Sequence, residues 1–139
     1  MSHPQLDNLL SIGKLKPEPA ADTELRGLVG SGMRRLDDAA RVELSLESRF
    51  DLGYNAAHAL ALAALRFHGY RSDSRYLVFQ CLQHTIELPP EQWRVLDEAH
   101  RKRNLAEYEG EMDVDENLVA ALLRVAREVA KRVEKMIVS

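Results

Sequence analysis

The stretch from Ala56 to Leu65 constrains the fold more than any other part of the chain. It consists of alanine and leucine with a single histidine, His58, so it would present apolar side chains on nearly every face of a helix. A helix of that kind is stable in water only when other elements surround it. The stretch is also far shorter than the ~20 apolar residues that span a bilayer. It therefore predicts the buried centre of a helical bundle, within a helix over residues 46–68 that ends at Gly69.

The segments on either side of this helix also have helical periodicity. Further helices are predicted from about Asp22, from the Ser72–Ser74 cap to His84, from Pro90 to Glu109, and after Asp113 and Asp115. No segment alternates β-branched and polar residues over the length of a strand. The predicted fold class is all-α, an antiparallel bundle of about five helices that forms one domain over residues 22–139. Residues 1–21 are expected to be an N-terminal leader, partly ordered at best, because Pro17 and Pro19 break any helix there.

The charge balance excludes a protein that holds nucleic acid by its net charge alone. The 139 residues carry a formal charge of -3, so any contact with a polyanion must come from a local patch. The single cysteine, Cys81, lies in an apolar run, which predicts a buried, unreactive thiol and neither an internal disulfide nor a cysteine metal cluster. The N-terminus has neither a basic start nor a long apolar segment, so we expect no signal peptide and a cytoplasmic protein.

The predicted helix over residues 90–109 carries the most informative pattern. At roughly 100° per residue, one face of this helix suits packing against the core and contains Val95, Leu96, Ala99 and Ala106. A polar stripe lies beside that face, made of Trp93, His100, Arg103, Asn104, Glu107 and, at its margin, Tyr108. The stripe is either a network that holds the bundle together, with polar pairs one helical turn apart, or a site that faces a cleft or an interface.

The same helix and the central helix also carry a family likeness. Residues 99–110 (AHRKRNLAEYEG), 49–58 (RFDLGYNAAH) and 63–71 (AALRFHGYR) resemble, in order, the signature helix, the long central helix and its closing turn in the HEPN superfamily, in particular one bacterial branch of it. The similarity covers roughly residues 24–138. It implies a helical bundle that forms a homodimer, in which the signature helices of both subunits line a shared cleft.

The resemblance also implies roles for individual residues. In HEPN members that cut RNA, the motif is an arginine, a polar residue that is often asparagine, three further residues and a histidine. The arginine steadies the phosphate and the histidine takes part in proton transfer as the ribose 2′-hydroxyl attacks, without a metal or another cofactor. Arg103 and Asn104 match this motif, whereas Tyr108 occupies the histidine position. Tyrosine, with a reference pKa near ~10 against ~6.5 for histidine, is a poor general base at neutral pH.

The other charged and titratable residues give weaker signals. Arg101 and Lys102 join Arg103 in a short basic cluster that two subunits would double, which favours an anionic ligand. The basic stripe on the last predicted helix, which includes Arg124 and Lys131, has glutamates interleaved and is expected to be a solvated face. His58 is expected to be a hydrogen-bonded core histidine. The histidines show no metal-ligand spacing, so no metal site is predicted.

Three hypotheses follow from these observations. The first is a HEPN-like dimer that binds RNA or a nucleotide, with catalysis doubtful because of Tyr108. The second is an RNA-cleaving HEPN toxin or defence ribonuclease, metal-independent, in which His100 replaces the missing base. The third is an interaction module that partners a nucleotidyltransferase or another chain. The candidate ligand-binding residues are Arg101, Lys102, Arg103, Asn104 and Glu107, and the candidate catalytic residues are His100, Arg103, Asn104 and Tyr108.

Overall fold

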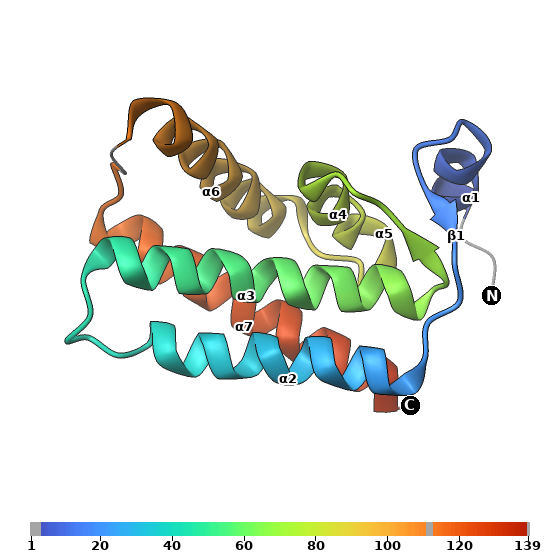
Figure 1. Cartoon of the computed structure of the whole chain (residues 1–139), viewed down its shortest axis with the longest axis horizontal. Coiled ribbons are helices and arrows are strands. Elements are labelled where there is room, and N and C mark those ends of the chain that lie inside the picture. The colour runs from blue at the N-terminus through green and yellow to red at the C-terminus, as the bar shows by residue number, and fades with distance from the viewer. Residues whose placement is uncertain (1–3, 111–112, 139) are drawn as a thin grey trace.

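The protein is an all-α helical bundle, as predicted. The computed structural model describes residues 4–110 and 113–138. Its helices are α1 (Pro4–Ser11), α2 (Asp22–Ala39), α3 (Leu46–Phe67), α4 (Arg75–Gln80), α5 (Leu82–Thr85), α6 (Pro90–Glu109) and α7 (Glu116–Val138). Two short strands, β1 (Lys16–Pro17) and β2 (Tyr70–Arg71), complete the fold (Figure 1). None of the helices in the described ranges is long and apolar enough to cross a membrane.

The central position of α3 follows from its sequence. This helix contacts α2 and α7 along its length and α4, α5 and α6 on its other side (Figure 1). Its alanines at 56, 57, 61, 63 and 64 are buried, as are Leu60 and Leu65. Small side chains allow neighbouring helices to approach closely, and burial from several directions removes the apolar surface of α3 from water. The prediction of a buried central helix is confirmed.

Local signals determine most helix ends. The hydroxyls of Ser45 and Ser74 accept hydrogen bonds from the first turns of α3 and α4, and Pro90 is the first residue of α6. Gly110, with φ of 74°, ends α6 in the left-handed conformation. No side chain caps the start of α2: Ala21 is the N-cap residue, and Asp22 lies inside the helix, where it pairs with Arg26. The predicted helix over residues 75–84 is divided at Cys81 into α4 and α5.

Residues 4–21 form part of the folded chain. Leu6 and Leu15 are 0% and 2% exposed and belong to the same core as α3. β1 pairs antiparallel with β2, with Lys16 opposite Arg71. The ladder is only two residues long, so it leaves no alternating pattern in the sequence. These contacts place the N-terminal segment beside the turn that follows α3.

Two glycines of α2 offer a matched test of how closely α2 packs on α3. A Cβ atom added at Gly32 would lie 2.7 Å from Cγ of Leu60, which is fully buried, whereas one added at Gly27 meets no atom within 4 Å. We expect Gly32→Ala to destabilise the fold by about 1–3 kcal/mol through overpacking. Gly27→Ala should stabilise it by about 0.5–1 kcal/mol, the gain in helix propensity. Thermal unfolding of both variants measures this difference, and equal effects would contradict the close α2–α3 packing.

Candidate functional site

Helix α6 attaches to the bundle mainly through its first half. Leu96 and Ala99 are buried, and Val95 and Ala106 are half-buried, so the predicted packing face is the one that meets the core. Toward its C-terminal end α6 rises away from α3 (Figure 1), and Leu105 and Tyr108 are 52% and 90% exposed. The polar stripe therefore lies at the margin where α6 leaves the core.

His100 lies at the centre of this margin and bonds through both ring nitrogens. Its Nδ1 is 2.9 Å from the hydroxyl of Tyr54 on α3, and its Nε2 is 3.2 Å from Nδ2 of Asn104. An amide nitrogen can only donate, so in this arrangement Nε2 accepts and Nδ1–H donates to the Tyr54 oxygen. Burial, and then the charge of Arg103, lower the pKa of His100, which favours the neutral ring that these hydrogen bonds require.

Tyr54 brings two arginines together. Its side chain is only 1% exposed, and burial raises its pKa. The guanidinium carbon of Arg103 on α6 lies 5.1 Å from the centre of the Tyr54 ring, and that of Arg75 on α4 lies 5.8 Å from it. Both distances are within the range of cation–π attraction. Side chains of three helices thus converge on one aromatic ring.

A second histidine completes the group. His58, one helical turn after Tyr54 on α3, is half-buried, and its ring lies 5.7 Å from that of Phe79, edge to face. Burial, followed by the charges of Arg75 and Arg103, lowers its pKa to about 4. Within the described residues it makes no hydrogen bond, so the expectation of a hydrogen-bonded core histidine was wrong. We refer to Tyr54, His58, Arg75, His100, Arg103 and Asn104 as the histidine–arginine cluster.

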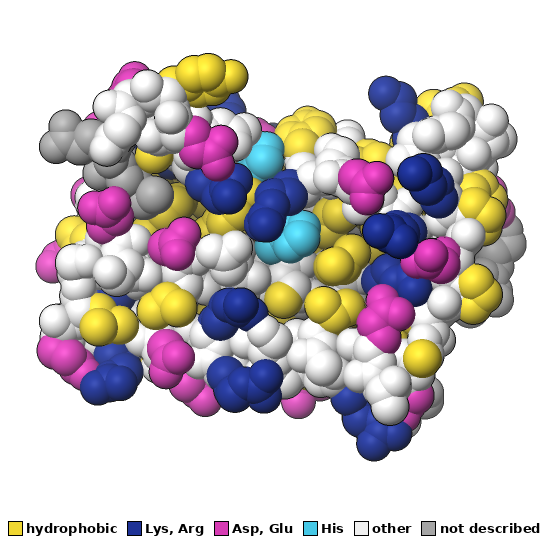
Figure 2. Space-filling model, in the orientation of Figure 1, with side chains coloured by type: hydrophobic (Ala, Val, Ile, Leu, Met, Phe, Trp, Pro, Cys, Tyr) yellow, Lys and Arg dark blue, Asp and Glu magenta, His cyan; other side chains and the backbone are white. Residues whose placement is uncertain are grey.

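The cluster faces the surface between α3, α4 and α6. In Figure 2 histidine side chains lie there beside lysine and arginine side chains on an otherwise mixed surface. Arg103 pairs with Glu107 at 3.2 Å, whereas Arg75 has the amide oxygen of Asn55 at 3.5 Å as its polar neighbour and forms no ion pair within residues 4–110 and 113–138. The acidic residues of the described chain therefore pair with only one of the two guanidinium groups.

The structure brings together part of the predicted site. His100, Arg103 and Asn104 belong to the cluster, and Glu107 contacts it through its ion pair with Arg103. Arg101 pairs instead with Asp97 at 3.4 Å, and Lys102 lies 3.8 Å from Asp113. Tyr108 points into solvent. Arg101, Lys102 and Tyr108 therefore lie outside the cluster of a single chain.

The contributions of α3 and α4 to the cluster were not predicted. Tyr54, His58 and Arg75 had no expected role in the site, although Phe50, Tyr54 and His58 follow one another at four-residue spacing and so lie along one face of α3. That spacing is the feature of the sequence from which the contribution of α3 to the cluster could have been predicted. Arg75 follows the cap residue Ser74 and carries no comparable signal.

Comparison of the chain with protein-family models, curated proteins and solved structures gives no significant match. The HEPN resemblance rests on residues 49–58, 63–71 and 99–110 and stays a prediction.

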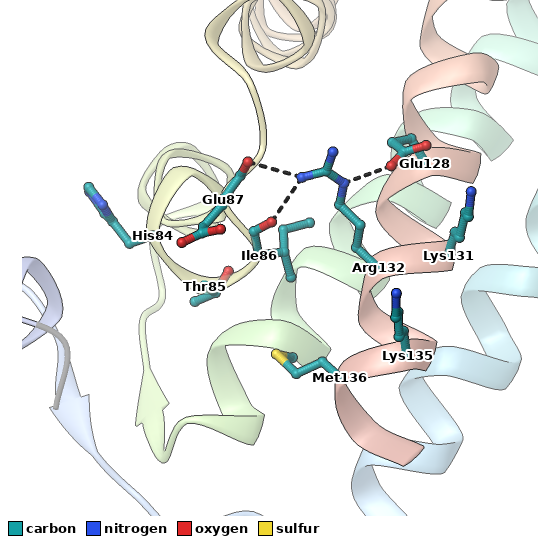
Figure 3. A pocket seen from close by; sticks show the side chains of 9 residues that line it. All are labelled: His84, Thr85, Ile86, Glu87, Glu128, Lys131, Arg132, Lys135 and Met136. Carbon is teal, nitrogen blue, oxygen red and sulfur yellow. Dashed lines mark hydrogen bonds and ion pairs between the residues drawn. The ribbon is translucent and has the colours of Figure 1, made fainter. Parts of the chain in front are cut away.

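The cavity drawn in Figure 3 is lined by none of the predicted site residues. It has a volume of about 570 Å³ and lies between the loop after α5 and the C-terminal half of α7. Arg132 crosses it and donates to Glu128 at 2.7 Å and to the carbonyls of Ile86 and Glu87 at 3.1 and 3.0 Å. This arginine therefore links the loop to α7. No group of three histidine, cysteine or acidic residues suited to a metal ion occurs in the part of the chain that the structure describes.

Proposed function

We propose that the protein is a HEPN-like homodimer that binds RNA or a nucleotide at the histidine–arginine cluster. The observation that supports this most directly is the convergence of Arg75 and Arg103 on the ring of Tyr54. Two guanidinium groups held close together repel each other, and Glu107 offsets only the charge of Arg103. A phosphate group would relieve this repulsion, and its oxygens match the planar donor geometry of arginine.

The neutral groups of the cluster suit the remainder of a nucleotide. His58 has ring nitrogens that no described residue uses, and it stays uncharged at pH 7 because its pKa is about 4. Asn104 keeps an amide oxygen for a further hydrogen bond, since only its nitrogen contacts His100. Neutral donors and acceptors beside fixed cations favour recognition of a base edge or a ribose hydroxyl.

The same geometry favours binding over cleavage. Both nitrogens of His100 already make hydrogen bonds, so this ring is not free to accept a proton from a ribose hydroxyl. An imidazole with a pKa of about 4, such as His58, is a weak general base at neutral pH. The cluster therefore supports the binding hypothesis more strongly than a ribonuclease that uses His100.

The exposed side of α6 supports a second subunit. Leu105 and Tyr108 are large side chains that the single chain leaves in solvent, and they lie on the helix that the HEPN resemblance places at the dimer axis. An isologous contact there would bring two copies of Arg101 and Lys102 together beside the cluster. A nucleotidyltransferase partner, the alternative, would cover the same face.

Binding of a labelled single-stranded RNA, followed by fluorescence anisotropy, tests the proposed site. We expect Arg75→Ala and Arg103→Ala each to weaken binding about tenfold, the loss of one charge-assisted hydrogen bond of about 1.5 kcal/mol. Arg124→Ala and Lys131→Ala remove exposed charges of α7 and should change affinity less than about twofold. Equal losses from all four variants would place the contact surface elsewhere.

A further inference from the structure

A second concave surface adjoins the histidine–arginine cluster. It is a cavity of about 470 Å³ between residues 9–16 of the N-terminal segment and the segment that leads into α4. Lys14, Lys16 and Arg71 line it together with Tyr76 and Gln80. In Figure 2 lysine and arginine side chains lie, among other places, in the centre beside the histidines and at the right toward β1, where acidic side chains are interleaved. The cavity thus brings a second group of basic residues near the cluster.

Tyr76 forms the boundary between the two sites. It lines the cavity, and its ring centre lies 6.0 Å from that of His100 and 6.3 Å from that of Trp93. Trp93 is itself fixed, because its indole N–H donates to the carbonyl of Phe79 at 3.1 Å. Tyr76 nevertheless remains 43% exposed. It is an aromatic ring that its neighbours hold in place and that solvent can still reach.

Cations outnumber acidic groups around the cavity. Lys16 and Arg71 lie 3.8 and 3.9 Å from Asp73, and Arg71 is also 3.4 Å from Glu18. Lys14 forms no ion pair among residues 4–110 and 113–138. Asp73 and Glu18 thus face Lys16 and Arg71, while Lys14 is a third cation that neither carboxylate pairs with, which leaves capacity for an anion.

We propose that this cavity is a second subsite for a single-stranded RNA that continues from the histidine–arginine cluster, with a base stacked on Tyr76. This inference rests on the proposed function and narrows it: the ligand is an oligonucleotide rather than a mononucleotide. An accessible aromatic ring between two groups of cations is the arrangement with which proteins bind single strands, because every base has a face to stack and every nucleotide a phosphate. In a duplex the bases are already stacked on each other, so a paired strand does not fit.

Ligands of different length distinguish the two subsites, because a mononucleotide can occupy only one of them and an oligonucleotide can reach both. We would measure affinities for uridine monophosphate and for a labelled oligouridylate of about eight nucleotides, within the ~4–16 nucleotides typical of such surfaces. Wild-type protein should bind the oligonucleotide at least about tenfold more tightly, the effect of about one stacked base. Tyr76→Leu and the double variant Lys14→Ala/Lys16→Ala should remove most of this gain and leave the affinity for uridine monophosphate unchanged.

Three controls make the outcome specific. Tyr76→Phe keeps the ring and should bind as wild type does, and Lys131→Ala/Lys135→Ala removes two lysines from α7 and should have little effect. Arg75→Ala should weaken both ligands, because it belongs to the first subsite. Thermal unfolding checks that each variant is folded.

Three other results would overturn the inference, and they differ in what they imply for the proposed function. Equal affinity for both ligands, without an effect of the Tyr76 and lysine variants, would leave the proposed function intact and remove the second subsite. No binding of either ligand would overturn both. Displacement of the oligonucleotide by an acidic peptide that itself depends on Tyr76 would assign the surface to a protein partner.

Discussion

Replacement of Arg66 by alanine is expected to lower the free energy of unfolding by about 3 kcal/mol and the melting temperature by roughly 10 °C. Arg66 is only 5% exposed at the end of α3. Its guanidinium group donates to both carboxylate oxygens of Glu24 on α2, at 2.7 and 3.1 Å, and to the carbonyls of Glu18 and Pro19 at 2.6 and 3.2 Å. Alanine would leave all these acceptors without their donor.

The effect of Arg66→Ala should depend on pH in a defined direction. The hydrogen bond from Arg66 lowers the pKa of Glu24 below its ordinary value of 4.5. A carboxyl group whose pKa is lowered in the folded state stabilises the fold above the unfolded pKa and loses this contribution as the pH falls through the folded pKa. The difference between wild type and Arg66→Ala should therefore shrink below about pH 4.5.

Arg26→Ala is the matched control for this experiment. Arg26 forms an exposed ion pair with Asp22 on α2, the helix that carries Glu24, and its loss should cost less than about 1 kcal/mol. Thermal unfolding of both variants from about pH 3 to pH 7 gives the comparison. Arg66→Ala protein that melts at the wild-type temperature at neutral pH would show that this network does not hold the N-terminal segment to α2 and α3.

Tyr108→His is expected to raise metal-independent RNA cleavage by about a hundredfold or more over a wild type with little or no activity. The HEPN resemblance assigns this position to the histidine that transfers protons, and Arg103 and Asn104 already match the rest of the motif. Tyr108 is 90% exposed, so the substitution should leave the fold unchanged. Because the side chain points away from the cluster of its own chain, the gain requires a second subunit.

Cleavage of a labelled single strand in EDTA measures this gain. Tyr108→Phe should not produce it, and addition of Arg103→Ala to Tyr108→His should abolish it. Light scattering on the same samples reports whether a dimer is present, and a species of only 15.8 kDa would count against the shared site. Strong wild-type cleavage that His100→Ala removes would instead support the ribonuclease with an altered site. An inactive Tyr108→His dimer would instead point to a binding or purely structural role.

The fold was largely predictable because its signals are local. The bounds of α3 and α6 follow from apolar spacing, Ser45, Pro90 and Gly110, all of which act within one or two helical turns. The burial of Leu6 and Leu15 was not predictable in this way, because it depends on contacts with residues distant in the sequence. Arg66 looked like an ordinary charged residue near a helix end, where most arginines are solvated.

The candidate site was predictable only where it lies on one helix. Helical spacing placed His100, Arg103 and Asn104 on a common stripe, and the structure keeps them together. Tyr54 and Arg75 join them from α3 and α4, and no periodicity relates residues of different helices. Which residues of α6 meet other helices and which meet solvent, as Tyr108 does, is likewise decided by the crossing of α6 over the bundle.

Histidine NMR tests the central claim, that RNA binds at the histidine–arginine cluster, most directly. His58 and His100 belong to the cluster, whereas His68 contacts the carbonyl of Thr85 and His84 lines the cavity of Figure 3, so the chain contains its own controls. Bound phosphate would offset the arginine charges that help to lower the pKa of His58 to about 4. We expect saturating single-stranded RNA to move the pKa values of His58 and His100 toward the ordinary 6.5. The ring NMR signals of His68 and His84 should not shift when RNA is added. Unchanged His58 and His100 titrations, or a change confined to His84, would contradict the claim.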